Sequence, residues 1–428
     1  MAMTIDEPGD EVSESMSDEA AARAEELADD EEVAAESAEE DDEDGSSDHS
    51  LTSAVTGRLG RVVRSERTAG IVASLEDSIW KFRRERKVGK GTLRATHVVG
   101  YRGFVADGRA YARVRVTEEP VVPKQAEALS DPEVIRANLR KFAALSFPGV
   151  KVRITLGDGE DRLETDRHGY ASGAMSVGEL VPGWHDYRVF TEPDDPDEEP
   201  ATARGRVLVP DPTAGVWVIS DIDDTVLQTG LAEGMSAVKN TLLGQAHTRR
   251  AVPGMATLYR AIEAGVPGDG RSPFFYLSTG PWSLYSMLTE FLSVRGFPTG
   301  PLFLTDWGPQ ERYITRSGTQ HKQQTLARLA AQYPEARFVL IGDSGQRDPY
   351  TYAEFAREHP DQVAAIIIVD VGLAEQAEQV QEQSELAVAE GLPFHFVADS
   401  REAAVKLADL GIIEANAVEA VSGAYERS

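Results

Sequence analysis

The sequence contains no cysteine among its 428 residues. Disulfide bonds, thiolate metal sites and cysteine nucleophiles are therefore excluded. It also has no apolar run near the roughly 18 residues that a membrane-spanning helix needs. The N-terminus has neither the basic start nor the apolar core of a secretion signal. These absences lead us to expect a cytoplasmic protein without a spanning helix.

Basic side chains and aromatic rings are scarce at the start of the chain. Residues 1–50 hold 21 acidic side chains, one arginine and no aromatic residue, whereas the rest of the chain holds 42 basic and 51 acidic side chains. Such a segment cannot bury enough apolar area to order itself, so we predict a disordered acidic tail. The tail could serve as a solvating segment or as a regulatory, partner-binding one.

The next segment reverses the sign of the charge. Residues 51–94 contain 11 basic and four acidic side chains. Apolar residues with helical spacing are Ile71, Val72, Leu75, Ile79 and Phe82. This basic amphipathic segment could contact an anionic membrane peripherally at the inner face, pack on the next domain or pair with the acidic tail. Nucleic acid is not expected as a partner, because the rest of the chain is acidic.

Residues 95–210 are predicted to be mainly β. Apolar and polar residues alternate in Tyr111–Val116, Lys151–Leu156 and Tyr187–Phe190, which predicts a strand at each. A further strand is predicted at Arg204–Val209. Asp107-Gly108 and Asp158-Gly159 are hairpin signals. One helix is expected after Ser130-Asp131-Pro132. We predict a small β-sandwich that acts as an accessory or docking domain, since no group of residues in it carries chemistry.

After a linker at 210–215 the pattern changes to alternating strands and helices. The predicted strands are Val216–Ser220, Phe274–Leu277, Arg337–Ile341, Ala364–Val369 and Phe394–Val397. The predicted helices are Met255–Ala264, Ser283–Arg295, Lys322–Gln332 and Pro349–Glu358, with a further one ending at Gly411. Nearly continuous apolar strands are typical of a buried parallel sheet. Residues 215–415 are therefore predicted to form a doubly wound α/β domain with a mostly parallel sheet, and 416–428 a C-terminal tail.

Polar residues follow three of these predicted strands. Asp221-Ile222-Asp223-Asp224-Thr225 follows the first strand, Ser278-Thr279-Gly280 the second and Gly342-Asp343 the third. Ligands bind at the carboxyl ends of strands in open parallel sheets, so these clusters should meet at one edge. Crowded carboxylates repel each other unless a cation lies between them. Asp221, Asp223 and Asp343 offer the oxygen ligands that Mg²⁺ prefers, and a bound phosphoryl group would lie against the metal and Ser278.

These residues resemble a known group. The motifs Asp221-Ile222-Asp223-Asp224-Thr225, Ser278, Lys322 and Gly342-Asp343-x-x-x-x-Asp348 are similar, in order, to the four motifs of haloacid dehalogenase superfamily phosphatases. The chain resembles more closely the catalytic domain of the actin-patch-associated phosphatidate phosphatase family. That similarity is carried by Ser220–Thr225, Pro281–Tyr285, Asp306–Gly308 and Leu340–Gly345. It extends over about 95–415 and is most specific over 215–350.

The resemblance implies a role for each matched residue. Asp221 would be the nucleophile that forms an aspartyl phosphate, and Asp223 the general acid and then base. Mg²⁺ would be held by the Asp221 carboxylate, the Asp223 backbone carbonyl and Asp343. The remaining roles are expected for Ser278 on a phosphoryl oxygen, Lys322 on the charge of the phosphoryl group, Thr225 in bracing the loop, and Asp348 in supporting the metal shell or orienting Lys322.

The spacing of the motifs bears on the substrate. The 52 residues between Thr225 and Ser278, and the 43 between Ser278 and Lys322, leave no room for a large cap domain. An open site favours a bulky or membrane-held substrate such as a phosphatidate-like lipid. A soluble phosphomonoester or phosphoprotein, and a non-catalytic binding scaffold, remain alternatives.

His247, Arg249 and Arg250 could contact a second anionic group or form a solvated turn. Trp282, Tyr285 and Trp307 could line the mouth of the site or pack in the core.

Overall fold

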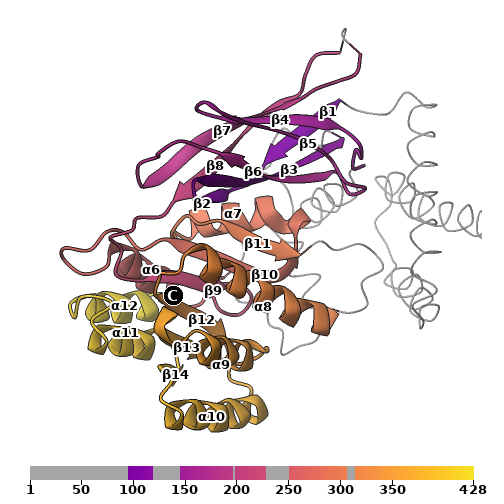
Figure 1. Ribbon diagram of the computed structural model, residues 1–428. Coiled ribbons are helices and arrows are strands. Elements are labelled where there is room, and N and C mark those ends of the chain that lie inside the picture. The colour runs from indigo at the N-terminus through magenta and orange to yellow at the C-terminus, as the bar shows by residue number, and fades with distance from the viewer. Residues whose placement is uncertain (1–94, 119–144, 196–197, 228–249, 306–313) are drawn as a thin grey trace, which may run out of the picture. The chain divides into compact units, whose positions relative to one another are not determined.

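The computed structural model of the protein describes residues 95–118, 145–195, 198–227, 250–305 and 314–428 (Figure 1). Residues Ala95–Ser428 form one compact unit. The predicted acidic tail, the basic segment 51–94 and the helix expected after Ser130 lie outside the described residues. Within the described part of the chain, no helix is both long and apolar enough to cross a membrane.

The first sheet joins eight strands in one hydrogen-bonded ladder. Its strands are β1 (Thr96–Gly100), β2 (Gly103–Ala106), β3 (Arg109–Glu118), β4 (Lys151–Leu156), β5 (Gly159–Glu164), β6 (Tyr170–Ser176), β7 (Gly183–Thr191) and β8 (Thr202–Val209). The order is β1-β3-β2-β8-β7-β4-β5, with β6 also paired to β3. All pairs are antiparallel except β2 with β8. Because the ladder forms a single sheet, the predicted sandwich of two sheets is not confirmed.

Both predicted hairpins are present in this sheet. Asp107 and Gly108 connect β2 to β3 and have positive φ angles of 49° and 68°. The second turn lies one residue earlier than predicted, because Leu156 pairs with Gly159 and leaves Gly157 and Asp158 as the turn. The positive φ there falls on Gly157, a conformation that glycine adopts without steric cost.

The second sheet has six parallel strands and supports the α/β prediction. Its strands are β9 (Trp217–Asp221), β10 (Phe274–Pro281), β11 (Leu302–Thr305), β12 (Phe338–Asp343), β13 (Val363–Val369) and β14 (Phe394–Val397). They follow the order β11-β10-β9-β12-β13-β14, and every pair is parallel. Strands β9, β10 and β11 follow one another toward one edge of the sheet, and strands β12, β13 and β14 follow one another toward the other edge. The boundary between β9 and β12 is thus the topological switch point, where such sheets bind ligands.

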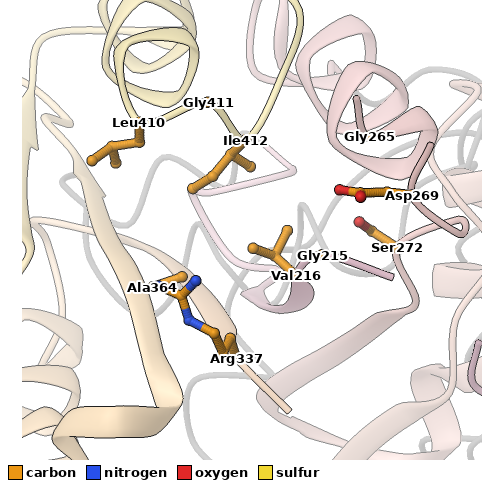
Figure 2. A pocket seen from close by; sticks show the side chains of 10 residues that line it. All are labelled: Gly215, Val216, Gly265, Asp269, Ser272, Arg337, Ala364, Leu410, Gly411 and Ile412. Carbon is orange, nitrogen blue, oxygen red and sulfur yellow. The ribbon is translucent and has the colours of Figure 1, made fainter. Parts of the chain in front are cut away.

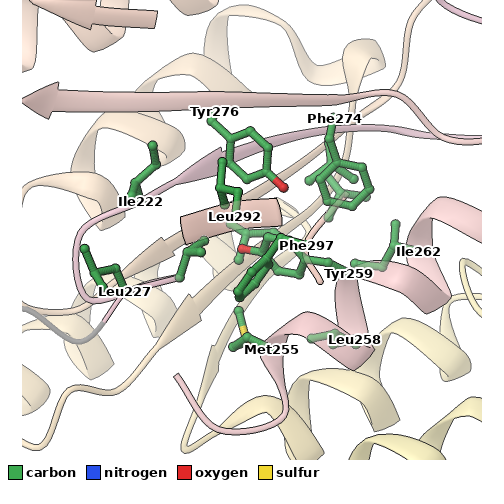
Figure 3. Close-up of a cluster of buried hydrophobic side chains, with 14 of the residues drawn as sticks. Ile222, Leu227, Met255, Leu258, Tyr259, Ile262, Phe274, Tyr276, Leu292 and Phe297 are labelled. Atoms are coloured by element: carbon green, nitrogen blue, oxygen red, sulfur yellow. The ribbon is translucent and has the colours of Figure 1, made fainter. Parts of the chain in front are cut away.

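Helices cover both faces of the parallel sheet (Figure 1). They are α6 (Met255–Ala264), α7 (Tyr285–Val294), α8 (Ile314–Gln332), α9 (Asp348–Glu358), α10 (Ala374–Ala389), α11 (Ser400–Asp409) and α12 (Ala417–Glu426), with short 3-10 turns η3 (Trp282–Leu284) and η4 (Pro360–Gln362). Helices α6, α7, α11 and α12 pack on the face that carries Val218, part of which Figure 3 shows. Helices α8, α9 and α10 pack on the face that carries Ile219. Alternate side chains of each strand therefore enter two separate cores.

Helix α12 lies beyond residue 415, where the sequence analysis placed the end of the domain. Its Val421 is fully buried, and the helix contacts α6 and α11. Its apolar positions are mostly alanine and valine, which give a weaker periodic signal than leucine or phenylalanine. The residues predicted as a C-terminal tail thus include a packed helix.

Candidate active site

Lys322 joins two of the predicted carboxylates. Its Nζ donates hydrogen bonds to Asp221 Oδ1 over 2.6 Å and to Asp348 Oδ1 over 2.5 Å. Lys322 is 3% exposed, and both aspartates are 0% exposed. The lysine lies within α8 rather than at its start as predicted, because α8 already begins at Ile314. Two carboxylates thus satisfy one buried ammonium, and the charge-assisted bonds orient all three side chains.

A third carboxylate completes a buried acidic group. One oxygen from each of Asp221, Asp343 and Asp348 lies within 4.8 Å of the others. Oδ2 of Asp221 and Oδ2 of Asp348 are buried and have no hydrogen-bond partner within the described residues. Three carboxylates against one ammonium leave buried negative charge, and unpaired buried oxygens cost free energy. Carboxylate oxygens are the ligands of hard cations, so this group could hold a metal ion.

The loop after β12 directs Asp343 toward this group. Asp343 Oδ1 accepts a hydrogen bond from the Gly345 backbone N–H over 2.6 Å, and Oδ2 accepts one from Gln346 Nε2 over 3.3 Å. Gly342, the residue before Asp343, lies close to the side chains of Asp348 and Tyr352. A Cβ at position 342 would lie 2.6 Å from Asp348 Oδ2 and 2.9 Å from Tyr352 Cε2. Glycine is therefore required there for Asp348 to reach Lys322.

We expect Gly342→Ala to destabilise the protein by about 1–3 kcal/mol, the usual cost of overpacking. It should also move Asp348 away from Lys322, because the added methyl group would occupy the space of the Asp348 carboxylate. Chemical denaturation would measure the loss of stability, and a structure of the variant would show the displacement. Gly178→Ala is the matched control, since a Cβ at position 178 would meet no atom within 4 Å. Equal behaviour of the two variants would contradict the packing argument.

Ser278 lies next to Asp223 at the end of β10. Its Oγ donates to Asp223 Oδ2 over 2.9 Å and accepts from the Gly280 backbone N–H over 2.9 Å. Ser278 is 1% exposed, whereas Asp223 is half-buried. The serine hydroxyl thus has fixed neighbours, and Asp223 lies nearer to solvent than Asp221 does.

A tight turn follows the predicted nucleophile. The Val226 and Leu227 N–H groups both donate to the Ile222 carbonyl, and Asp224 N donates to Leu227 O. Asp224 has a φ of 54°, in the left-handed region that aspartate tolerates better than most residues. Thr225 is fully buried, but its Oγ1 has no hydrogen-bond partner within the described chain. Backbone bonds therefore hold this loop.

Ser220 precedes Asp221 in β9 and contacts Tyr259 of α6, which Figure 3 shows in the core on one face of the sheet. Ser220 Oγ donates to the Asp221 carbonyl over 2.6 Å and lies 2.7 Å from Tyr259 Oη. Sequence reasoning missed this contact, because Tyr259 reads as one more apolar position of α6. The pair fixes the backbone at the residue that carries the carboxylate.

The acidic group has shifted pKa values. Burial raises the pKa of the Asp221 carboxyl well above its usual range, against the opposing effect of Lys322. Burial likewise raises the pKa of Asp343, and the Asp348 charge adds to that rise. Burial acts to lower the pKa of Lys322, but the Asp221 and Asp348 carboxylates outweigh it and raise the pKa above its ordinary value. The Asp221 and Asp343 carboxyls are therefore harder to ionise than free carboxyls, and the Lys322 ammonium is harder to deprotonate than a free one.

These shifts predict how stability depends on pH when metal is removed by a chelator. Folded-state pKa values of Asp221 and Asp343 above the unfolded value mean that the folded protein binds more protons. Their contribution to stability is fully present below about pH 4, the unfolded value, and is lost as pH rises toward the raised pKa values. We expect it to fall by up to about 1.4 kcal/mol per pH unit for each carboxyl.

Thermal unfolding of wild type and Asp343→Asn in chelator between pH 4 and 8 would test this. The comparison is needed because Asp194 and Asp399 have lowered pKa values and act in the opposite direction. The variant should lose less stability than the wild type as pH rises. Parallel pH profiles for the two proteins would refute the prediction.

The remaining sequence predictions have different outcomes. Trp282 and Tyr285 are each 8% exposed and belong to the core, so the packing alternative is confirmed for them. His247, Arg249 and Trp307 lie outside the described residues, and Arg250 is exposed. Contact of His247, Arg249 or Arg250 with a second anionic group stays a prediction.

The structure also has a cavity of about 240 Å³, whose lining residues Figure 2 shows. Its lining includes Gly215 and Val216 before β9, Arg337 before β12 and Ala364 near the start of β13. These positions mark the amino ends of the parallel strands, whereas Asp221 and Asp343 end β9 and β12. The cavity is therefore separate from the candidate active site.

Comparison with known proteins identifies the same stretch of chain. Residues 216–370 match the family model described as phosphatidate phosphatase APP1, catalytic domain. Phosphatidate phosphatase APP1 of Saccharomyces cerevisiae is 31% identical over 156 residues, which cover 36% of this chain and 26% of that protein. An uncharacterized protein of Schizosaccharomyces pombe is 28% identical over 158 residues, covering 37% of this chain and 25% of its own. The chain spans about a quarter of the length of these relatives.

Some solved structures are distantly similar. A carbohydrate acetylesterase from Xanthomonas citri aligns over 66% of this chain and 71% of its own, with 14% identity and a TM-score of 0.24. Similarity at this level bears on neither fold nor function. The family match, by contrast, contains Asp221, Lys322, Asp343 and Asp348. Residues 216–370 are therefore similar to the catalytic domain of phosphatidate phosphatase APP1, in agreement with the resemblance of the sequence motifs.

Proposed function

We propose that the protein is a Mg²⁺-dependent phosphatase of the haloacid dehalogenase type that hydrolyses a phosphomonoester through an aspartyl phosphate on Asp221. The observation that carries this proposal is the environment of one carboxylate. Asp221 Oδ1 is held by Lys322 over 2.6 Å, while Oδ2 is buried without a partner within the described residues. A carboxylate oriented in this way presents one oxygen to an incoming phosphoryl group.

In the first step, Asp221 Oδ2 forms a bond to phosphorus and the bond from phosphorus to the ester oxygen breaks. The leaving oxygen takes a proton from the Asp223 carboxyl. Before substrate binds, the hydrogen bond from Ser278 orients Asp223, whose half-buried position allows contact with both substrate and water. The products are an alcohol and a phosphoryl group bound to Asp221.

In the second step, water releases the phosphoryl group. The Asp223 carboxylate accepts a proton from a water molecule whose oxygen bonds to phosphorus, and the bond to Asp221 breaks. Inorganic phosphate leaves and both aspartates return to their starting states. One side chain thus serves as acid and then as base, which accounts for its placement beside the nucleophile rather than buried with it.

Ser278, Lys322 and the metal would provide the electrostatic contribution. In the complex with substrate the single Ser278 hydroxyl proton would turn from Asp223 to a phosphoryl oxygen, and the Lys322 ammonium would offset charge that develops on the phosphoryl group. Asp221, Asp343 and the Asp223 carbonyl would hold Mg²⁺, with Asp348 Oδ2 supporting the metal shell. When bound, the ion would neutralise the repulsion between these carboxylates and the phosphate.

We further propose a phosphatidate-like lipid as substrate. The similarity to phosphatidate phosphatase APP1 supports it, as does the short spacing between motifs, which leaves the site without a large cap. A soluble phosphomonoester or a phosphoprotein would use the same chemistry. A non-catalytic scaffold has no need for a buried lysine between two aspartates, so the Lys322 contacts favour an enzyme.

A phosphate-release panel tests the proposal. Phosphatidate in mixed micelles, a soluble aryl phosphate and a phosphopeptide would be compared with Mg²⁺ and with chelator. We expect Mg²⁺-dependent release that is fastest from phosphatidate. Release from the soluble esters alone would contradict a phosphatidate-like substrate. No release from any of the three would favour a non-catalytic binding scaffold.

Peripheral membrane contact through residues 51–94 stays a prediction, since these residues lie outside the described chain. Flotation with anionic liposomes would compare the full chain with one that lacks 51–94. We expect the full chain to float and the shortened chain to lose most of its binding, more so at low salt. Equal flotation of both would remove this segment as the membrane contact.

A further inference from the structure

The segment that follows Ser278 must be fixed for the serine to meet Asp223. The Ser278 hydroxyl accepts from the Gly280 N–H, and Thr305 Oγ1 donates to the Thr279 carbonyl over 2.8 Å. After Gly280 the chain passes Pro281 and enters η3 and α7. The pairing of β10 ends its regular register at Leu277, so the position of Ser278 depends on that strand and also on what holds the beginning of α7.

The beginning of α7 is held by Tyr101, which lies in the connection between β1 and β2 of the first sheet. The Tyr101 ring lies 4.9 Å from the Trp282 ring and 4.5 Å from the Tyr285 ring, measured between centroids. The Arg102 backbone N–H donates to the Tyr285 hydroxyl over 2.8 Å. Tyr101 is 3% exposed. Aromatic pairs at these separations prefer particular orientations, so the three rings fix one another as well as exclude water.

Tyr101 is itself fixed within the first sheet. The Tyr187 hydroxyl donates to the Tyr101 carbonyl over 2.5 Å, and the Tyr101 N–H donates to the Arg113 carbonyl over 3.0 Å. A Cβ at Gly205 would lie 2.1 Å from the Tyr187 ring, so glycine makes room for it. The Arg113 guanidinium carbon lies 4.7 Å from the Trp282 ring centroid. The first sheet thus presents Tyr101 as a rigid anchor.

We propose that the eight-stranded sheet positions the active-site segment 278–285, with Tyr101 as the positioning residue. Its ring holds Trp282 and Tyr285 and thereby sets the distance between Ser278 and Asp223. This inference rests on the proposed function and gives the sheet a role other than that of an accessory or docking domain. Displacement of a reacting group by about 1 Å can cost about 10²-fold in rate, so a small loosening should be measurable.

Phe104 offers a matched control in the same sheet. Its ring packs on Phe275 and Phe303 of the parallel sheet, with centroids 6.2 Å and 5.8 Å away. Both partners lie outside the segment 278–285. Phe104 is 4% exposed, about as buried as Tyr101. Truncation at Phe104 opens a cavity in the core that carries Ile219, and truncation at Tyr101 opens one in the core that carries Val218. Of the two, the Tyr101 truncation removes a contact with the active-site segment.

Hydrogen exchange of the amides in 279–285 tests the proposal without any turnover assay. We expect exchange about tenfold faster in Tyr101→Ala, unchanged in Phe104→Ala, and unchanged in Tyr101→Phe, which keeps the ring. If Tyr101→Ala does not fold, Tyr285→Phe removes just the hydroxyl that accepts from Arg102 and should raise exchange about threefold. Unchanged exchange in the folded test variant, or an equal rise in Phe104→Ala, would overturn the proposal.

Kinetics provide a second readout. Tyr101→Ala should lower kcat about tenfold with KM changed less than about twofold, and Phe104→Ala should keep kcat at a temperature where it is folded. A change confined to KM would contradict positioning. Faster exchange in Tyr101→Ala combined with no turnover in the wild type would refute the proposed phosphatase and support the positioning contact.

Discussion

Replacing Asp221 with asparagine should abolish phosphate release and leave the protein folded. Asparagine keeps the shape of the side chain and an oxygen that can accept from Lys322, but it cannot attack phosphorus. We expect turnover to fall by at least about 10⁴-fold, as is typical when a covalent nucleophile is removed. In chelator the variant should be no less stable than the wild type, because one buried carboxylate of three is neutralised. Phosphate release and thermal unfolding would measure both effects.

Asp158→Asn is the control, because Asp158 lies in the turn between β4 and β5 and outside the acidic group. It should match the wild type in both measurements. Turnover by Asp221→Asn within tenfold of the wild type would contradict covalent catalysis at this position. Unfolding of Asp221→Asn would contradict the view that the neighbouring carboxylates repel the negative charge of Asp221 in the folded protein.

Replacing Lys322 with methionine should damage both stability and activity. The change leaves Asp221 Oδ1 and Asp348 Oδ1 without their shared donor in a buried site. Removing one partner of a buried ion pair typically costs about 3–5 kcal/mol, so we expect a loss of this size in chelator at neutral pH. Turnover should fall by about 10²-fold or more, because charge on the phosphoryl group is no longer offset. Urea denaturation and phosphate release would measure these losses.

The double variant Lys322→Met/Asp348→Asn separates the two effects. Neutralising Asp348 removes one of the carboxylates left unpaired, so part of the stability should return. Activity should not return, since the ammonium is still absent. A Lys322→Met protein with wild-type stability would show that the pair contributes nothing to the fold, and recovery of turnover in the double variant would exclude an electrostatic role for Lys322.

Much of the parallel sheet and its active edge could be predicted from local sequence. Strands such as Phe338–Asp343 are short apolar runs that end in polar residues, and that change marks the carboxyl end of a buried strand. The sheet then brings Asp221 and Asp343 to one edge on either side of the switch point. Prediction succeeded here because the signal is local and the topology rules are strong.

Contacts between distant parts of the chain could not be predicted in this way. Tyr101 lies between β1 and β2 and Trp282 lies in η3, and the two rings meet through the tertiary fold. The local sequence around either residue does not indicate this contact. The start of α8 was also missed, since Gly318 has low helix propensity and lies within the helix. A Cβ at Gly318 would lie 3.0 Å from Thr279 Cγ2, so a tertiary contact overrides the local preference.

Chemical trapping of the phosphorylated enzyme tests the central claim most directly. The wild type would be mixed with saturating substrate and Mg²⁺, quenched in acid and reduced with borohydride, which converts an aspartyl phosphate to homoserine. Mass spectrometry of the peptide that contains residue 221 should show homoserine at that position, and none should form without substrate. Steady phosphate release with no modification at 221, or with modification at another aspartate, would contradict the account.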